Sequence, residues 1–136
     1  MAAPWSEDAG PAVKQDVAGL LNAALDVTCS TFAGGTASRH VMVLMTLDGS
    51  LNVRMAYGAD AVDTLVASIL DDHAGLRAAL VVPDCGDETD PTLRGYGDHR
   101  EGPAFDVRIT WRRRPDSPLL AIVDSRITHS AWWLFE

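Results

Sequence analysis

Apolar residues recur at helical spacing near the start of the chain. The apolar positions that follow Pro11 are Val13, Val17, Leu20, Leu21, Ala24 and Leu25. Because residues three and four apart share one face of an α-helix, this stripe predicts an amphipathic helix that begins at Pro11. Gly34 and Gly35 are typical helix terminators and should end it. Residues 1–10 are expected to be a polar lead-in.

The pattern then changes from helical spacing to that of strands. Residues 40–47 are mostly apolar, Asp48-Gly49 follows, and apolar and polar residues alternate through 50–57. An Asp-Gly pair between two such runs predicts a hairpin with a type I′ turn, in which both central residues have positive φ. The first strand is apolar on both faces and should be central in a sheet. The second should bury one face, formed by Leu51, Val53, Met55 and Tyr57.

A second amphipathic helix is expected to begin near Asp60, a favourable N-cap. The residues that would share its apolar face are Val62, Leu65, Val66, Ile69 and His73. This helix should stop at Gly75 or run on to about Leu80. Alternatively, residues 79–82 form a short strand.

The second half of the chain contains a long polar segment and a second alternating pattern. Gly, Pro and Asp dominate residues 83–103, which predicts a long acidic loop. Apolar and polar residues alternate through 105–112, the residues 114–118 form a turn, and an apolar run begins at Leu119. A second hairpin is therefore expected, with its last strand reaching towards Ile127.

These elements together predict one α+β domain over residues 1–136. The expected architecture is a two-layer sandwich: an antiparallel sheet of about four to five strands in two hairpins, with two helices packed on one face. The composition agrees with a single globular domain, since 47% of the residues are hydrophobic and 22% are charged.

The charge of the chain narrows its expected partners. The formal net charge is −8 at pH 7, which disfavours broad nucleic-acid binding and docking on anionic membranes, and favours a basic partner. No apolar run approaches the ~20 residues needed to span a bilayer, and the N-terminus lacks signal-peptide features, so a cytoplasmic location is expected. The two cysteines, Cys29 and Cys85, have no zinc-type spacing and are expected to be buried thiols, with a single disulfide as the alternative.

The polar segment 83–103 supplies the candidates for metal binding and catalysis. Its carboxylates, Asp84, Asp87, Glu88 and Asp90, are the kind of ligand that Ca²⁺ prefers, but their spacing does not match an EF-hand loop. Four neighbouring side chains, Tyr96, Asp98, His99 and Arg100, could perform acid–base chemistry if they converged on a substrate. Cys85 could act as a nucleophile with His99 or His129 as its base, although its acidic neighbours disfavour a thiolate. A solvated loop without metal or cofactor is the favoured interpretation.

Two groups of residues are candidates for protein contacts. The first is Trp111 with the basic run Arg112, Arg113 and Arg114. The second is the aromatic tail of residues 131–136, which contains Trp132, Trp133, Leu134 and Phe135. Such an apolar tail needs a cover, which is either this domain or another chain, because monomers rarely expose large apolar patches.

The sequence favours a non-enzymatic protein–protein interaction module: an adaptor, an inhibitor or immunity-type protein, or a subunit of a larger assembly. It would bind a protein partner or self-associate through its acidic surface and aromatic tail. The alternatives are a small-ligand or metal-binding domain that uses residues 83–103, and an enzyme with an unusual Tyr/His/Asp site in that segment.

Overall fold

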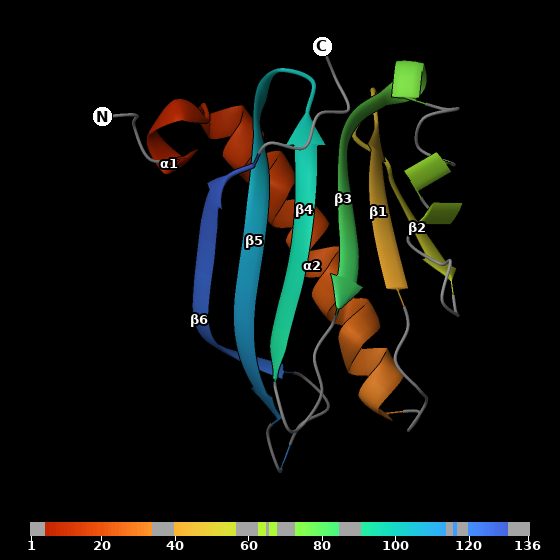
Figure 1. The fold of residues 1–136 in the computed structure, drawn as a ribbon, viewed down its shortest axis with the longest axis vertical. Coiled ribbons are helices and arrows are strands. Elements are labelled where there is room, and N and C mark those ends of the chain that lie inside the picture. Colours follow the sequence, from red (N-terminus) through yellow and green to blue (C-terminus); the bar gives the residue numbers. More distant parts are fainter. Residues whose placement is uncertain are drawn as a thin grey trace.

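A 23-residue helix crosses one face of a six-stranded antiparallel sheet in the computed structural model of the chain (Figure 1). The structure describes residues 5–33, 40–56, 63–64, 66–67, 73–84, 91–113, 116 and 120–130. The helical elements are α1 (Trp5–Asp8), α2 (Pro11–Ala33) and the 3₁₀ turn η1 (His73–Gly75). The strands are β1 (His40–Thr46), β2 (Leu51–Ala56), β3 (Leu76–Asp84), β4 (Thr92–His99), β5 (Gly102–Arg113) and β6 (Leu120–His129). The expected α+β class with an antiparallel sheet is confirmed.

The strands are ordered β2-β1-β3-β4-β5-β6 across the sheet. The hairpin β1–β2 was expected, but β3, β4, β5 and β6 form a continuous meander in place of one isolated second hairpin. The sheet therefore has more strands than the expected four to five. One additional strand, β4, lies inside the segment 83–103, so the prediction of a single long loop there is wrong.

Two glycines explain why β4 does not look like a strand in the sequence. Glycine is depleted in strands, and β4 contains both Gly95 and Gly97. At Gly97 a Cβ atom would lie 2.5 Å from the carbonyl oxygen of Ala79 and 2.5 Å from Cζ of Phe105. Glycine in a strand often marks such a close approach of a neighbouring chain. The residues that weaken the strand signal are thus the ones that let β4 fit between β3 and Phe105.

Helix α2 begins at Pro11 as expected and buries its apolar stripe on the sheet. Val13, Val17, Leu20 and Ala24 are all buried, in one cluster with residues of β1, β3, β4 and β5. None of the described helices is long and apolar enough to cross a membrane.

The expected polar lead-in contributes to this core instead. Trp5 in α1 is buried, its ring packs edge-on against Phe105 with centroids 5.6 Å apart, and its Nε1–H donates to the carbonyl oxygen of Pro103 at 3.1 Å. The burial of Trp5 is not evident from the sequence, because the acidic residues Glu7 and Asp8 follow it in α1 and make the segment look polar.

The opposite face of the sheet has its own apolar cluster, made of Met42, Leu44, Leu76, Ala79 and Val81. Val66 packs against it, and residues 63–64 and 66–67 are helical. The expected arrangement of two helices on one face is therefore not confirmed. Val66 packs on the face of the sheet opposite the one that α2 covers. The strands β1 and β3 are apolar on both faces, so both faces need a cover. The other expected members of the second helical stripe lie outside the described residues or, as His73, are in η1.

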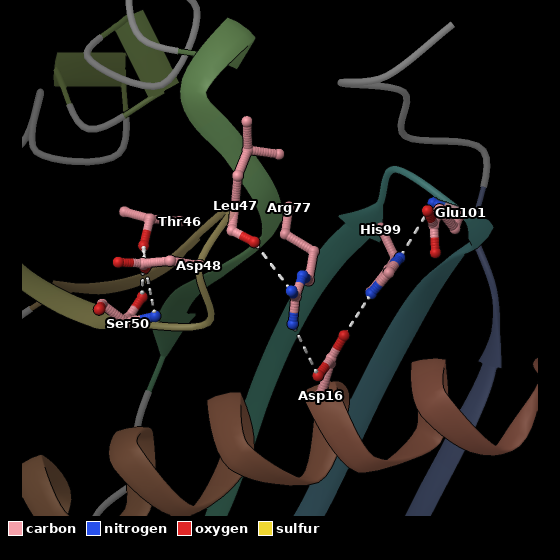
Figure 2. Close-up of polar contacts among 8 residues, drawn as sticks. All are labelled: Asp16, Thr46, Leu47, Asp48, Ser50, Arg77, His99 and Glu101. Carbon is pink, nitrogen blue, oxygen red and sulfur yellow. Dashed lines mark hydrogen bonds and ion pairs between the residues drawn. The ribbon is translucent and has the colours of Figure 1, made fainter.

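The turn between β1 and β2 differs from the expected type I′ (Figure 2). Among the described residues only Gly49 has positive φ, at 90°, so Asp48 does not. The N–H of Gly49 donates to the carbonyl oxygen of Thr46 at 2.9 Å, and the N–H of Thr46 donates to that of Ser50 at 2.9 Å. This is a three-residue loop ending in a left-handed glycine, the next commonest hairpin form. The Asp48 carboxylate stabilises it by accepting hydrogen bonds from the Thr46 hydroxyl and the Ser50 N–H.

Strand β2 has the expected alternation but not the expected burial. Its residues Leu51, Val53 and Met55 lie in register with Met45, Val43 and Val41 of β1, and therefore on the face that α2 covers. They are nevertheless exposed, so the prediction of a buried face is wrong. The cluster beneath α2 includes residues of β1 and β3 but none of β2, because β2 is the edge strand and α2 contacts it less than it contacts β1 and β3.

Candidate functional site

A polar cluster lies where α2 meets the sheet, formed by Asp16 of α2, Arg77 of β3 and His99 of β4 (Figure 2). Nε2 of His99 lies 2.8 Å from Oδ2 of Asp16, and Nη1 of Arg77 lies 3.6 Å from Oδ1 of the same carboxylate. The His99 side chain is only 1% exposed. Its carboxylate partner is therefore the group that compensates its burial.

Both ring nitrogens of His99 are already used. The backbone N–H of Glu101 donates to Nδ1 at 3.0 Å, so Nδ1 is an acceptor and the ring proton belongs on Nε2, where it is donated to Asp16. A general base needs a nitrogen that faces the proton it removes. His99 has none, so the geometry makes it a structural link between α2 and β4.

The arginines around this cluster are held by backbone carbonyl groups. Nη2 of Arg77 donates to the carbonyl oxygen of Leu47 at 2.8 Å, and Nε of Arg100 donates to that of Leu76 at 2.9 Å. An open depression of about 510 Å³ lies beside them, lined by Ala12, Gln15, Asp16, Leu47, Arg77, Arg100 and Glu101. Because these guanidinium groups satisfy carbonyl oxygens at strand and turn ends, the cluster fixes the junction of α2, β3 and the β1–β2 turn.

The predicted catalytic group does not converge on one site. The alternation of β4 places Tyr96 and Asp98 on one face of the sheet and His99 on the other. Tyr96 packs with the cluster on the face opposite α2. His129, the other candidate base, contacts Asp8 at 2.7 Å near α1. Cys85 lies outside the described residues.

Only some of the residues predicted to bind metal or to contact a protein are among the described ones. The carboxylates of Asp87, Glu88 and Asp90 lie outside the described residues. In the part of the chain that the structure describes, no three His, Cys, Asp or Glu side chains are grouped as a metal site would require. Trp111 is buried in the core, so its ring is not part of the surface, whereas Arg112 is exposed. The side chains of Arg113 and Arg114 and the tail residues Trp132–Phe135 are not among the described ones, and their proposed role stays a prediction.

Among the described residues, an exposed apolar row lies on the edge strand β2 and its turn. Leu47, Leu51, Val53 and Met55 are 54%, 45%, 39% and 47% exposed. The sequence does not reveal that this row is exposed, because alternation shows that the two faces of a strand differ but not whether anything covers the apolar one. On the other edge strand, β6, Ile122 and Val123 are also exposed.

Comparison with known proteins found no matching family, no matching curated protein and no matching solved structure. Any function assigned to this chain therefore has to come from its own residues. The features that carry chemistry are the apolar edge of β2 and the charged groups on the sheet.

Proposed function

We propose that this chain is a non-enzymatic protein–protein interaction module that associates through the edge strand β2, and that the occupant of this edge is a second copy of the chain. The observation that carries the proposal is the exposed apolar row Leu51, Val53 and Met55 on the strand that ends the described sheet. A strand at the edge of a sheet can pair its backbone with a strand of another chain, and apolar side chains beside it add burial to that pairing.

The two edges of the sheet differ in how well they are protected. Natural edge strands are blunted by proline, lysine or a β-bulge. The ladder of β1 and β2 runs without a register shift from His40↔Ala56 to Met45↔Leu51, and β2 contains neither proline nor lysine. The ladder of β5 and β6 has a shift between Thr110 and Trp111, which leaves Val123 of β6 without a partner. The regular edge, β2, is thus the better template.

The residues of β2 are complementary to themselves. If two copies pair antiparallel about Val53, Leu51 lies opposite Met55 of the second copy, and Val53 lies opposite Val53. All the apolar side chains then form one continuous row on the α2 face. On the other face each Arg54 lies opposite Asn52, so the two guanidinium groups do not oppose each other. A two-fold symmetric contact requires such a self-complementary patch.

We propose further that the acidic surface and the aromatic tail of residues 131–136 contact a different protein partner. The net charge of −8 favours a basic one. Such a partner would bind beside the β2 contact or compete with it.

The test is the mass in solution, measured by light scattering after size exclusion over a range of protein concentrations. The 14.6 kDa chain is expected to form a dimer, and Val53→Lys is expected to make it a monomer. The control is Val123→Lys on the other edge, at a valine that is 62% exposed against 39% for Val53, and this variant should remain a dimer. Near-ultraviolet circular dichroism checks that both variants are folded. A wild-type chain that stays monomeric at every concentration overturns the proposal, as does a Val53→Lys variant that stays dimeric.

A further inference from the structure

Three arginines on neighbouring strands lie side by side on the sheet face opposite α2. Arg94 of β4 pairs directly with Arg108 of β5, which pairs directly with Arg126 of β6. Directly paired residues have Cβ atoms about 4.5–5.5 Å apart, and like charges at that spacing destabilise a sheet. The chain has only 11 basic residues against 19 acidic ones, yet places three in one row. We call Arg94, Arg108 and Arg126 the arginine row.

The arginine row lines an open depression of about 400 Å³, together with Asp106 and Thr128. This volume is within the range of small-molecule sites, roughly 300–1,000 Å³. The walls carry three guanidinium groups, one carboxylate and one hydroxyl. The depression is therefore positive overall on a chain whose net charge is strongly negative.

Two arginines of the row, Arg108 and Arg126, have no ion-pair partner among the described residues. One acid flanks the row on each side of the same face: Asp106, which pairs with Tyr96, on one side, and Asp124, which pairs with Thr110, on the other. Neither acid forms an ion pair with Arg108 or Arg126, and these two guanidinium groups have no hydrogen-bonded partner among the described residues. Arg94 is held by an interaction of its own. Within the part of the chain that the structure describes, Arg108 and Arg126 are thus available to an external anion.

We infer that the arginine row binds the phosphate group of a small phosphorylated molecule. A guanidinium donates two parallel N–H bonds to phosphate oxygens, and neighbouring strands lie about 4.8 Å apart, so Arg108 and Arg126 can hold different oxygens of one phosphate. A single carboxylate offers only two oxygens to this pair and to the Thr128 hydroxyl, whereas a phosphate offers more. The Asp106 carboxylate accepts a hydrogen bond from a hydroxyl or amino group of the ligand. Asp106 and Asp124 also repel long polyanions, which limits the site to small molecules.

The site is independent of the proposed β2 contact. The arginine row lies on β4, β5 and β6, whereas β2 is the opposite edge of the sheet. The Val53→Lys variant should therefore bind the anion as the wild type does. If either the β2 contact or the anion site is disproved, the other proposal is unaffected.

The test is calorimetric titration of the full chain with inorganic phosphate, pyrophosphate, glucose 6-phosphate and citrate, at an ionic strength held constant with sodium chloride. Saturable binding of the phosphates is expected, with glucose 6-phosphate tighter than inorganic phosphate because its hydroxyl groups reach Asp106. Arg108→Gln and Arg126→Gln should each weaken it by about tenfold or more. The control Arg112→Gln removes the same charge from an exposed position of β5 that does not line the depression, and should leave the affinity within about twofold.

Three outcomes would overturn the inference. The first is no saturable binding of any phosphate at constant ionic strength. The second is equal weakening by Arg112→Gln and Arg108→Gln, which would mean general attraction and no site. The third is tighter binding of citrate than of the phosphates, which would make carboxylates the ligand class. Since Arg108 and Arg126 are exposed, both variants are expected to fold, and Arg108→Lys, which keeps the charge but loses the paired N–H groups, should be intermediate in affinity.

Discussion

His99 of β4 donates a hydrogen bond to Asp16 of α2 across 2.8 Å, at a position where the imidazole is almost completely buried. A second contact of the same chemistry, between His129 and Asp8, is 2.7 Å long, but its two side chains are 38% and 46% exposed. The described residues thus contain two His–Asp pairs, one with a buried imidazole and one that is exposed to solvent. Their comparison reports on burial, together with the added contact of Asp16 with Arg77.

Removal of the carboxylate should cost far more at the buried pair. Asp16→Ala leaves the Nε2–H of His99 buried without an acceptor, and we expect the free energy of unfolding to fall by about 1–3 kcal/mol. Asp8→Ala should cost about 0–1 kcal/mol, because water replaces the lost partner. Urea denaturation measures both. Asp16→Asn, which keeps an acceptor oxygen, should recover part of the loss. Equal losses for Asp16→Ala and Asp8→Ala would contradict the structural role of His99.

A methyl group at Gly97 should destabilise the sheet. Its carbon would lie 2.5 Å from Cζ of Phe105 and from the carbonyl oxygen of Ala79, so the Phe105 ring or β3 must move. We expect Gly97→Ala to lower the free energy of unfolding by about 1–3 kcal/mol. Gly10→Ala is the matched control, since a Cβ there would meet no atom within 4 Å, and its effect should be within about 0.5 kcal/mol. A Gly97→Ala variant as stable as Gly10→Ala would mean that β4 does not approach Phe105 this closely.

The elements that the sequence predicted well are those whose pattern is local. The start of α2 at Pro11 and the ranges of β1, β2 and most of β5 follow from periodicity and turn residues within a few positions. Strand β4 was not predicted, because its glycines weaken the strand signal. Gly97 is explained only by its contact with Phe105 of the neighbouring strand, which the sequence does not show. Similarly, Trp5 stands among polar and acidic residues and becomes a core residue only when α1 reaches the carbonyl oxygen of Pro103.

The candidate sites were harder to predict, because they depend on distant residues. Asp16 and His99 are 83 positions apart, and no spacing rule links them. The only local signal was that Asp16 borders the apolar stripe of α2, next to Val17. The arginine row is equally invisible in the sequence, where Arg94, Arg108 and Arg126 are separate residues. It follows only from the register of β4, β5 and β6.

Tyr96 should ionise later than an ordinary tyrosine. Burial, with a smaller contribution from the Asp63 carboxylate, raises the pKa of Tyr96 above its usual 10.0. A raised pKa means that the folded state favours the neutral phenol, so this contribution to stability is present below pH 10.0 and is lost as the pH rises through the folded-state pKa. Tyrosinate absorption in a Tyr57→Phe variant reports Tyr96 alone, because the chain has two tyrosines. Adding Asp63→Asn should lower the midpoint slightly, and a midpoint at or below 10.0 would refute the assignment.

Asp48 should remain ionised far into the acid range. Hydrogen bonds from the Thr46 side chain and then from Ser50 lower the pKa of Asp48 from 3.8 to about 2. A lowered pKa means that its contribution to the hairpin is present above pH 3.8 and is lost as the pH falls through about 2. In a Thr46→Val variant the pKa should move back towards 3.8, as followed by carboxyl carbon NMR. Ser50→Ala keeps the backbone donor and should shift the pKa less, so a larger shift in Ser50→Ala would reverse the assigned causes.

The ladder between β1 and β3 divides the chain into two pieces. Every other junction of the described sheet joins strands that are consecutive in the chain, so residues 1–56 and 73–136 share the sheet along this one ladder, from Val41↔Val82 to Thr46↔Leu76. Both strands are apolar on both faces, and each piece alone would leave them uncovered. Two fragments produced by a cut between residues 57 and 72 should therefore aggregate when expressed separately. Expressed together, they should reassemble into one soluble complex by fragment complementation.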